Sequence, residues 1–170
     1  MVLAQQLYEG VELGEGSVGL ITYMRTDSVN LSEESLKNAV MFLEKNLGAN
    51  YALHSPRRFA TKTKGAQEAH EAIRPTDPLR TPESIKNLLA PRQFKLYDLI
   101  WRRFIASQMP PAIFDATTVD IAAVASDQSP TASSQLLVTK YTFRASGQTI
   151  RFDGFLKVWP AKTKETLLPA

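Results

Sequence analysis

The run Met109-Pro110-Pro111 divides the sequence into two parts with different hydrophobic periods. Before it, apolar residues recur every three or four positions, as on one face of a helix. After it, apolar and polar residues alternate, as they do in a strand. Proline interrupts both kinds of element, so the run marks a boundary. The sequence therefore predicts an α+β fold, in which a mainly helical part precedes an incomplete antiparallel β segment with too few strands to close a sheet by itself.

Start and stop signals define the expected helices. Ser32 is a good N-cap before an acidic first turn, and Thr81-Pro82-Glu83 is a second helix start. An aromatic stripe predicts that the helix after Pro91 is buried along one face, with Arg102 and Arg103 off the stripe and solvated. The expected helices are Val2–Glu9, 33–47, Gln67–Ile73, 82–90 and 91–108, and the last two form a pair of the kind found in helix-turn-helix modules.

The expected strands follow β-prone runs bounded by turn residues. The first is Val18–Arg25, inside the helical part. Beyond the prolines, Ser126–Ser134 reads as a polar loop, Ser146-Gly147-Gln148 and Asp153-Gly154 as turns, and residues 161–170 as a disordered tail. The later strands are expected at Thr117–Ala123, Leu136–Arg144, Thr149–Phe152 and Phe155–Trp159.

Composition excludes several classes of protein. The 170 residues include no cysteine, so a disulfide framework and a cysteine-based zinc site are excluded. No apolar run approaches the roughly 20 residues of a membrane span, and a cytoplasmic protein is expected. The net charge of +3 is compatible with nucleic-acid binding and almost equally with an ordinary, slightly basic soluble protein.

The stretch from Gly19 to Ser28 carries the first candidate site. In a strand, Tyr23 and Arg25 lie on the same face, about 7 Å apart along the chain. A phenol beside a guanidinium can serve as a nucleophile next to a group that binds an oxyanion. The ordinary alternative is a tyrosine packed in a strand beside a solvated arginine, and these residues alone favour that alternative.

Two motifs carry a resemblance to a known family. Gly-Leu-Ile-Thr-Tyr-Met-Arg-Thr-Asp-Ser at 19–28 resembles the active-site segment of the type IA DNA topoisomerases, and Ala-Gln-Glu-Ala-His-Glu-Ala-Ile-Arg-Pro at 66–75 resembles their downstream motif. The likeness runs from about Val2 to about Pro160. It implies that Tyr23 forms a 5′-phosphotyrosyl link with one DNA strand, that Arg25 holds an oxygen of the scissile phosphate, and that His70 helps to place the DNA. Thr26 and Asp27 lie beside this site, and Asp27 is first expected to cap a turn.

Further DNA contacts are expected around the second motif. A basic loop, Ser55–Gly65, contains no acidic residue, and such a loop is either solvated or bound to phosphates. In the expected helix, His70 and Arg74 share a face, with Gln67 one turn earlier. A lone helical histidine is usually a surface residue, and for Arg74 an ion pair with Glu71 or Asp77 is weighted equally with DNA contact. The candidates for phosphate contact in the loop are Arg57, Arg58, Lys62 and Lys64.

The resemblance also implies what the chain lacks. The family needs a separate catalytic domain with a general-acid glutamate and an Asp-x-Asp cluster for Mg²⁺, and this sequence contains no Asp-x-Asp. We therefore expect a piece of a longer enzyme: a winged-helix or helix-turn-helix-like tyrosine domain at 1–108, part of a β-rich arch at 109–160, and the tail. Its expected partners are single-stranded DNA and the remaining domains. No cofactor is expected in the piece itself, Mg²⁺ is expected in the parent enzyme, and the piece alone is expected to be inactive.

Three other classes of protein share features with this sequence. Tyrosine recombinases carry a His-x-x-Arg pair upstream of the tyrosine, whereas here His70 and Arg74 are four apart and downstream, which excludes that class. A non-catalytic helix-turn-helix module would bind DNA without needing Tyr23. A structural domain whose β segment extends a partner's sheet would show no salt-dependent affinity for single-stranded DNA.

Overall fold

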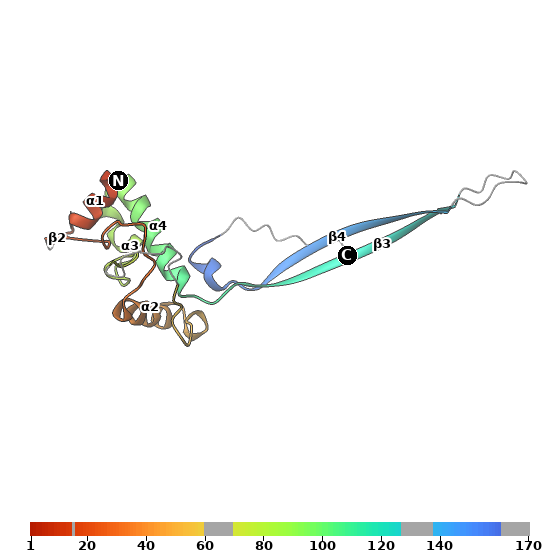
Figure 1. Cartoon of the computed structure of the whole chain (residues 1–170), viewed down its shortest axis with the longest axis horizontal. Coiled ribbons are helices and arrows are strands. Elements are labelled where there is room, and N and C mark those ends of the chain that lie inside the picture. The colour runs from red at the N-terminus through yellow and green to blue at the C-terminus, as the bar shows by residue number, and fades with distance from the viewer. Residues whose placement is uncertain (15, 60–69, 127–137, 161–170) are drawn as a thin grey trace, which may run out of the picture. The chain divides into compact units, whose positions relative to one another are not determined.

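The computed structural model describes residues 1–14, 16–59, 70–126 and 138–160. These residues form two compact units, one made of 1–111 with 154–160 and the other lying within 112–153. The first unit is mainly helical and the second is an antiparallel hairpin, so the predicted α+β class is confirmed (Figure 1). The expected tail at 161–170 lies outside the described residues. Within the described part of the chain, no helix has the length and apolar character needed to cross a membrane.

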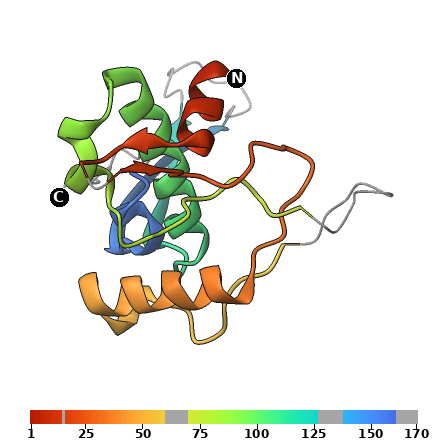
Figure 2. The same cartoon turned by 90° about the vertical axis from the view of Figure 1, so that its left-hand side faces the viewer.

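The helical unit begins with α1 (Val2–Glu9), which leads into a small ribbon of β1 (Val11–Glu12) and β2 (Ser17–Val18). It continues with α2 (Glu33–Asn46), α3 (Pro82–Ile85) and α4 (Pro91–Ser107). Figure 2 shows α1, in red, on the opposite side of this unit from α2, in orange. The short 3₁₀ turns are η1 (Ala49–Tyr51), η2 (Lys86–Leu88) and η3 (Gly154–Lys157).

The helix starts that the sequence predicted are confirmed. The hydroxyl of Ser32 accepts a hydrogen bond from the backbone N–H of Ser35 at 3.3 Å, and that of Thr81 accepts one from Ser84 at the same distance. Each bond satisfies an N–H that the first turn of a helix would otherwise leave without a partner. The predicted helix at 82–90 is shorter in the structure, because α3 gives way to η2 before Ala90.

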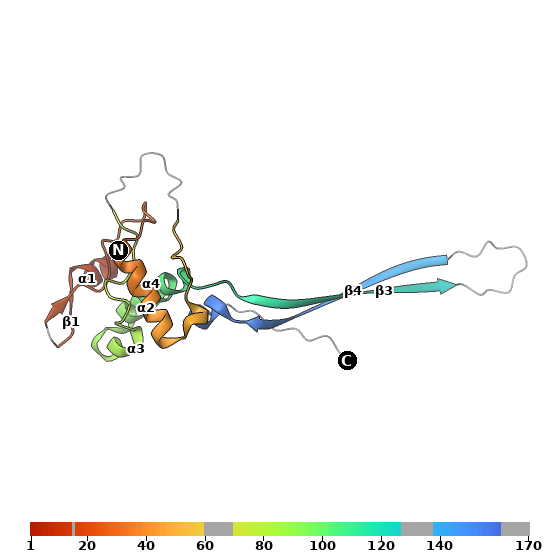
Figure 3. The ribbon, with the colours of Figure 1, turned by 90° about the horizontal axis from the view of Figure 1, so that it is seen from below.

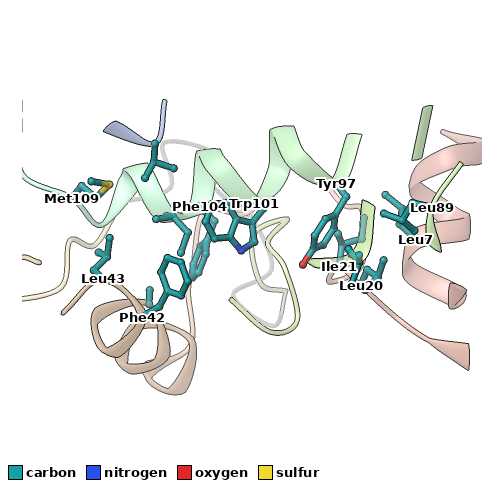
Figure 4. Packing of buried hydrophobic residues seen from close by; sticks show 14 residues of the cluster. Leu7, Leu20, Ile21, Phe42, Leu43, Leu89, Tyr97, Trp101, Phe104 and Met109 are labelled. Carbon is teal, nitrogen blue, oxygen red and sulfur yellow. The ribbon is translucent and has the colours of Figure 1, made fainter. Parts of the chain in front are cut away.

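The core is organised along α4 (Figure 4). Leu7 of α1 gathers with Leu20 near the Tyr97 end, and Phe42 of α2 packs edge-to-face on Trp101, with ring centroids 5.3 Å apart. The two polar tips in this stripe are satisfied: the Tyr97 hydroxyl donates to the carbonyl of Arg80 at 2.7 Å, and the Trp101 indole donates to that of Pro78 at 2.9 Å. Burial without lost hydrogen bonds is what lets these aromatic residues occupy a core.

The structure corrects the expectation that the side chain of Arg102 is only solvated. Its guanidinium donates to the carboxylates of Asp98 and Glu83 and to the carbonyl of Val158 at 3.0 Å. The return of the chain to this unit after the hairpin brings that carbonyl to α4, which no local pattern on the helix could indicate.

The expected strand Val18–Arg25 is also corrected. Only Val18 belongs to a strand, β2, and Ile21 makes an isolated bridge with Pro75. Beyond that bridge the backbone turns tightly, since the N–H of Arg25 donates to the carbonyl of Tyr23 at 2.9 Å. The ladder does not continue beyond the bridge, because the N–H of Arg74 donates to the side-chain hydroxyl of Thr22 at 3.0 Å in place of the Thr22 carbonyl.

The hairpin consists of β3 (Ile113–Ser126) and β4 (Val138–Phe152), which twist about each other along their length (Figure 3). The expected turn at Ser146-Gly147-Gln148 is wrong: β4 runs through it, with Gly147 opposite Thr117. A long partner strand keeps the ladder regular across residues that would otherwise favour a turn. The expected loop after Ser126 lies largely outside the described residues.

The predicted strand Phe155–Trp159 is wrong as well. The chain leaves β4 through Gly154, whose φ of 50° lies in the left-handed region, and forms η3. A Cβ on Gly154 would meet the carbonyl oxygen of Pro111 at 2.5 Å, so the residue must be glycine for this close approach. The N–H of Phe155 donates to the carbonyl of Pro110 at 3.0 Å, and Val158 enters the core of the helical unit.

Candidate active site

Tyr23 lies at the edge of a pocket of about 440 Å³ in the helical unit. Its residue surface is 51 % exposed, so its ring is accessible although it packs on two neighbours. The pocket is lined by residues of α1, of the stretch 19–23 and of the stretch 70–76, namely Tyr8, Gly19, Ile21, Thr22, Tyr23, His70, Glu71 and Thr76.

The two sequence motifs are joined by hydrogen bonds around Thr22. Its N–H donates to the carbonyl of Arg74 at 2.9 Å, while its hydroxyl donates to the carbonyl of Ala72 at 2.7 Å and accepts from the N–H of Arg74 at 3.0 Å. On one side of this centre Thr76 binds the carbonyls of Gly19 and Leu20. The described part of the second motif is therefore held against the first, as a single site requires.

His70 is brought to Tyr23 by this arrangement. Their ring centroids are 6.4 Å apart with an angle of 38° between the planes. The carbonyl of His70 accepts a hydrogen bond from the buried hydroxyl of Ser28. The Nδ1 atom of His70 is buried and has no hydrogen-bond partner among the described residues.

The expected helix Gln67–Ile73 is wrong over the residues that are described, 70–73. The backbone there bonds outward, with the N–H of Ala72 donating to the carbonyl of Asn30 at 2.8 Å, so its groups are unavailable for helical bonds. His70 and Arg74 consequently do not share a helical face. Gln67 lies outside the described residues.

Arg74 forms an ion pair, one of the two alternatives that its sequence position left open. Its guanidinium meets the carboxylate of Glu71 at 2.6 Å and donates to the carbonyl of Pro75 at 3.0 Å, with the side chain only 12 % exposed. Burial opposes ionisation of Glu71, but hydrogen bonds from Arg74 and Ser32 outweigh it and lower the pKa of this carboxyl. The pair anchors the second motif to the start of α2.

Arg25 is tied to Asp27. Its Nε donates to a carboxylate oxygen of Asp27 at 2.8 Å, and both side chains are partly exposed. The carboxylate thus engages a guanidinium, in place of the turn-capping role that we expected for Asp27, and its second oxygen is buried with no partner among the described residues. Arg25 is not among the residues that line the pocket, and Thr26 is exposed.

The basic loop is described as far as Phe59. The loop itself contains no acidic residue, but Arg58 forms an ion pair with Glu33 of α2. The backbone of Arg57 exchanges hydrogen bonds with the buried amide of Gln108. Both arginines line a second pocket of about 280 Å³ with Phe59 and residues 29–31. Lys62 and Lys64 lie outside the described residues.

The sequence did not predict Tyr8, Thr22 and Thr76 as parts of the site, and it predicted Glu71 only as a possible ion-pair partner of Arg74. Tyr8 packs edge-to-face on Tyr23, with ring centroids 5.4 Å apart, yet in the sequence it is one residue of a short helix. No three acidic, histidine or cysteine side chains converge within the described ranges. The described residues therefore do not offer the set of ligands that a Mg²⁺ site needs.

Comparison with known proteins shows the family to which the chain is similar. A family model described as DNA topoisomerase matches residues 1–170. DNA topoisomerase 1 of Xylella fastidiosa is 47% identical over 160 residues, which are 94% of this chain and 18% of that protein. DNA topoisomerase 1 of Campylobacter jejuni is 45% identical over 169 residues, which are 99% of this chain and 22% of that protein.

A solved structure extends the likeness to the fold. Full-length topoisomerase I from Thermotoga maritima matches with a TM-score of 0.74 and 35% identity, over 100% of this chain and 24% of that one. The chain thus spans about a fifth of the length of the curated relatives that it matches. The resemblance read from the two motifs is confirmed, and the chain belongs to the DNA topoisomerase family, as a segment of its bacterial type IA members.

Proposed function

We propose that this chain is the tyrosine-bearing DNA-cleavage segment of a type IA topoisomerase, which opens one DNA strand, passes a strand through the gap and reseals it, thereby relaxing negative supercoils. The observation that carries the proposal is the accessible Tyr23 ring beside His70, in a pocket built from both family motifs. A bacterial enzyme of this kind acts on chromosomal DNA, so we place it in the cytoplasm with the nucleoid.

The proposed reaction is a transesterification at Tyr23. The phenolic oxygen forms a bond to phosphorus while the bond from phosphorus to the 3′ oxygen breaks. The phenol loses its proton, the departing 3′ oxygen gains one, and the phosphate stays on the protein as a 5′-phosphotyrosyl ester. Resealing is the same exchange in reverse and consumes no nucleotide, because the ester conserves the bond.

The cationic residues have distinct proposed roles. Arg25, released from Asp27 when a phosphate approaches, donates to a non-bridging oxygen and stabilises charge in the transition state. His70, with Thr26 and Asp27 beside the site, places the strand at Tyr23. Arg74 supports the site through its pair with Glu71. Phosphates farther along the strand are assigned to Arg57, Arg58, Lys62, Lys64 and Gln67.

The domain limits belong to the same proposal. Residues 1–108 would form the tyrosine domain, and 109–160 part of an arch completed by strands from elsewhere in the protein. A separate domain would hold Mg²⁺ and supply the acid that protonates the 3′ oxygen. A chain without that domain should bind single-stranded DNA without cutting it.

Covalent capture tests the proposal. Single-stranded DNA, labelled so that the label stays with the 5′ phosphate, is incubated with Mg²⁺ and either this chain or the full-length protein that contains it. We expect a labelled protein adduct only with the full-length protein, its loss in Tyr23→Phe, and its retention in Tyr141→Phe, which alters an exposed tyrosine of β4.

Two outcomes would contradict the proposal. An adduct that survives Tyr23→Phe would assign the nucleophile elsewhere, and an adduct on the isolated chain would show that no further domain is needed. The alternative, a non-catalytic helix-turn-helix module, predicts that Tyr23→Phe leaves every activity intact. No specific observation favours it, since α3 has only four residues.

A further inference from the structure

We infer that the pocket beside Tyr23 is a subsite for one nucleobase of single-stranded DNA, with the ring of Tyr8 as its stacking wall. The inference rests on the proposed function and assigns a ligand to a part of the site that the reaction itself does not use. The base would belong to a nucleotide next to the phosphate that Tyr23 attacks.

The first observation is the exposed aromatic pair. Tyr8 and Tyr23 meet edge-to-face at 5.4 Å, yet their exposed fractions are 42 % and 51 %. Aromatic pairs that serve only as core packing are buried, as Phe42 and Trp101 are here at 6 % each. A fixed aromatic pair at the surface, with ring area left accessible, is the usual platform on which proteins stack the bases of single strands.

The second observation is the charge of the pocket. Glu71 is among the lining residues, and its lowered pKa keeps it ionised at neutral pH. That carboxylate is neutralised by its pair with Arg74, and the described lining residues include no lysine or arginine that would bind a phosphate inside the pocket, so the backbone of the strand belongs outside it, at the Tyr23 hydroxyl. The uncharged base is then the part of the nucleotide that can enter, and about 440 Å³ is within the size range of small-molecule sites.

The third observation is that three polar side chains of the pocket, those of Thr22, Thr76 and Glu71, are already engaged within the protein. The Thr22 hydroxyl bonds to the backbone of Ala72 and Arg74, that of Thr76 bonds to the carbonyl of Gly19, and the Glu71 oxygens accept from Ser32 and Arg74. Groups that already hold the backbone cannot also read the edge of a base. These three side chains should therefore add little preference between purines and pyrimidines, and stacking on the Tyr8 ring is itself tolerant of both.

The fold also holds Tyr8 in position before DNA arrives. The N–H of Leu20 donates to the carbonyl of Leu7 at 2.7 Å, and the backbone of Gly19 passes so close to Tyr8 that a Cβ there would lie 2.6 Å from its carbonyl oxygen. The last turn of α1 is thus fixed against the stretch that carries Tyr23. A preformed platform of this kind loses little conformational entropy on binding.

Fluorescence of single-stranded oligonucleotides tests the subsite on the 170-residue chain. One 2-aminopurine is placed at successive positions of an oligothymidylate, and both its quenching and the dissociation constant are measured. We expect one position with strong quenching, a loss of that quenching with roughly 5- to 100-fold weaker binding in Tyr8→Ala and Tyr8→Leu, and near wild-type behaviour in Tyr8→Phe. Tyr141→Ala, which removes an exposed tyrosine from β4, should leave both quantities unchanged.

The outcomes separate this inference from the function on which it rests. Unchanged quenching and affinity in Tyr8→Ala would overturn the subsite while leaving covalent capture by Tyr23 as it was. Equal losses in Tyr8→Ala and Tyr8→Phe would also overturn it, because a ring would then be insufficient. Absence of binding by every variant, wild type included, would contradict the DNA contacts of the proposed function itself.

Discussion

At the scale of single residues, one hydroxyl group joins the two halves of the site. Thr22 Oγ1 donates to the carbonyl of Ala72 and accepts from the N–H of Arg74, so it satisfies two backbone groups of a segment that has no regular secondary structure. Such a segment depends on side chains for its backbone hydrogen bonds. Thr22 is therefore a positioning residue for His70 and does not itself need to touch DNA.

Thr22→Val keeps the shape of the side chain and removes both bonds. We expect a loss of about 1–3 kcal/mol in the free energy of unfolding, because the N–H of Arg74 and the carbonyl of Ala72 lose a partner. Urea denaturation measures it. Thr26→Val, at an exposed neighbour, should change stability by less than about 0.5 kcal/mol, and equal effects of the two variants would contradict the role of Thr22.

The pair of Arg25 and Asp27 predicts a gain in DNA affinity. Asp27→Asn releases the guanidinium and raises the net charge by one, so single-stranded DNA should bind about 2- to 5-fold more tightly at low salt. Asp120→Asn is the matched control, since it frees Arg144 on the hairpin and changes the charge equally. If both variants gain the same affinity, the gain comes from net charge alone, and the prediction that Arg25 contacts the DNA is contradicted.

Because of Glu71, we expect the free energy of unfolding to decrease in acid. Its pKa is lower in the folded state than its ordinary value of 4.5, so the pair with Arg74 stabilises the fold above that value. This contribution is lost as pH falls from about there through the lowered pKa. In chemical unfolding followed from pH 7 to pH 3, Glu71→Gln should lack this part of the acid destabilisation. Identical pH profiles of the two proteins would refute it.

At the scale of elements, the contact between α1 and the stretch after β2 sets the geometry of the pocket. Gly19 lets the two backbones meet, and Leu20 then bonds to the last turn of the helix. The helix α1 is short, and Leu7 is its one buried residue among those described. Its stability therefore depends on the packing of Leu7 in the core along α4. Short helices owe most of their stability to such tertiary contacts.

Gly19→Ala tests that contact. The added Cβ would lie 2.6 Å from the carbonyl oxygen of Tyr8. The backbone fixes the positions of both atoms, so neither can rotate away and α1 must shift. We expect a destabilisation of about 1–3 kcal/mol in thermal or urea unfolding. The same variant should also weaken the 2-aminopurine quenching assigned to Tyr8. Wild-type stability and quenching together would show that α1 is not held at this point.

At the scale of the whole molecule, the two units differ in what stabilises them. The helical unit has a continuous core, whereas the hairpin exposes Val119, Ile121, Tyr141 and Phe143. The register places Ile121 opposite Phe143, and on the other face Asp120 pairs with Arg144. A two-stranded hairpin with one uncovered apolar face is only marginally stable in water. This is the arrangement that further strands of a longer protein would complete, as proposed above.

Hydrogen exchange should separate the two units. Amides of β3 and β4 around Ile121 and Phe143 should exchange at least about 100-fold faster than those of α4 around Trp101 in the isolated 170-residue chain, because protection follows the stability of each unit. Amides of α2 around Leu43 provide an internal reference within the core. Hairpin amides as slow as those of α4 would mean that the hairpin is stable without a cover.

Features that depend on near neighbours along the chain could be predicted without knowledge of the fold. The N-cap residues Ser32 and Thr81, the buried stripe of α4 and the change of period at Met109-Pro110-Pro111 all act over a few positions, and each was readable before the fold was known. The two motifs likewise identified the family, because their residue order is unusual over ten positions.

The assembly of the site, in contrast, depends on contacts between residues that are far apart in the chain. The irregular backbone at 70–74, the pairing of Arg58 with Glu33 and the place of Tyr8 beside Tyr23 depend on residues between 15 and 52 positions apart. At such separations a hydrogen bond or ring contact leaves no periodic trace in the sequence, because its partners are chosen by the packing of whole elements. The motif in the sequence made Tyr23 a candidate nucleophile, which stays a prediction, while its contacts with Tyr8 and His70 were set by the fold.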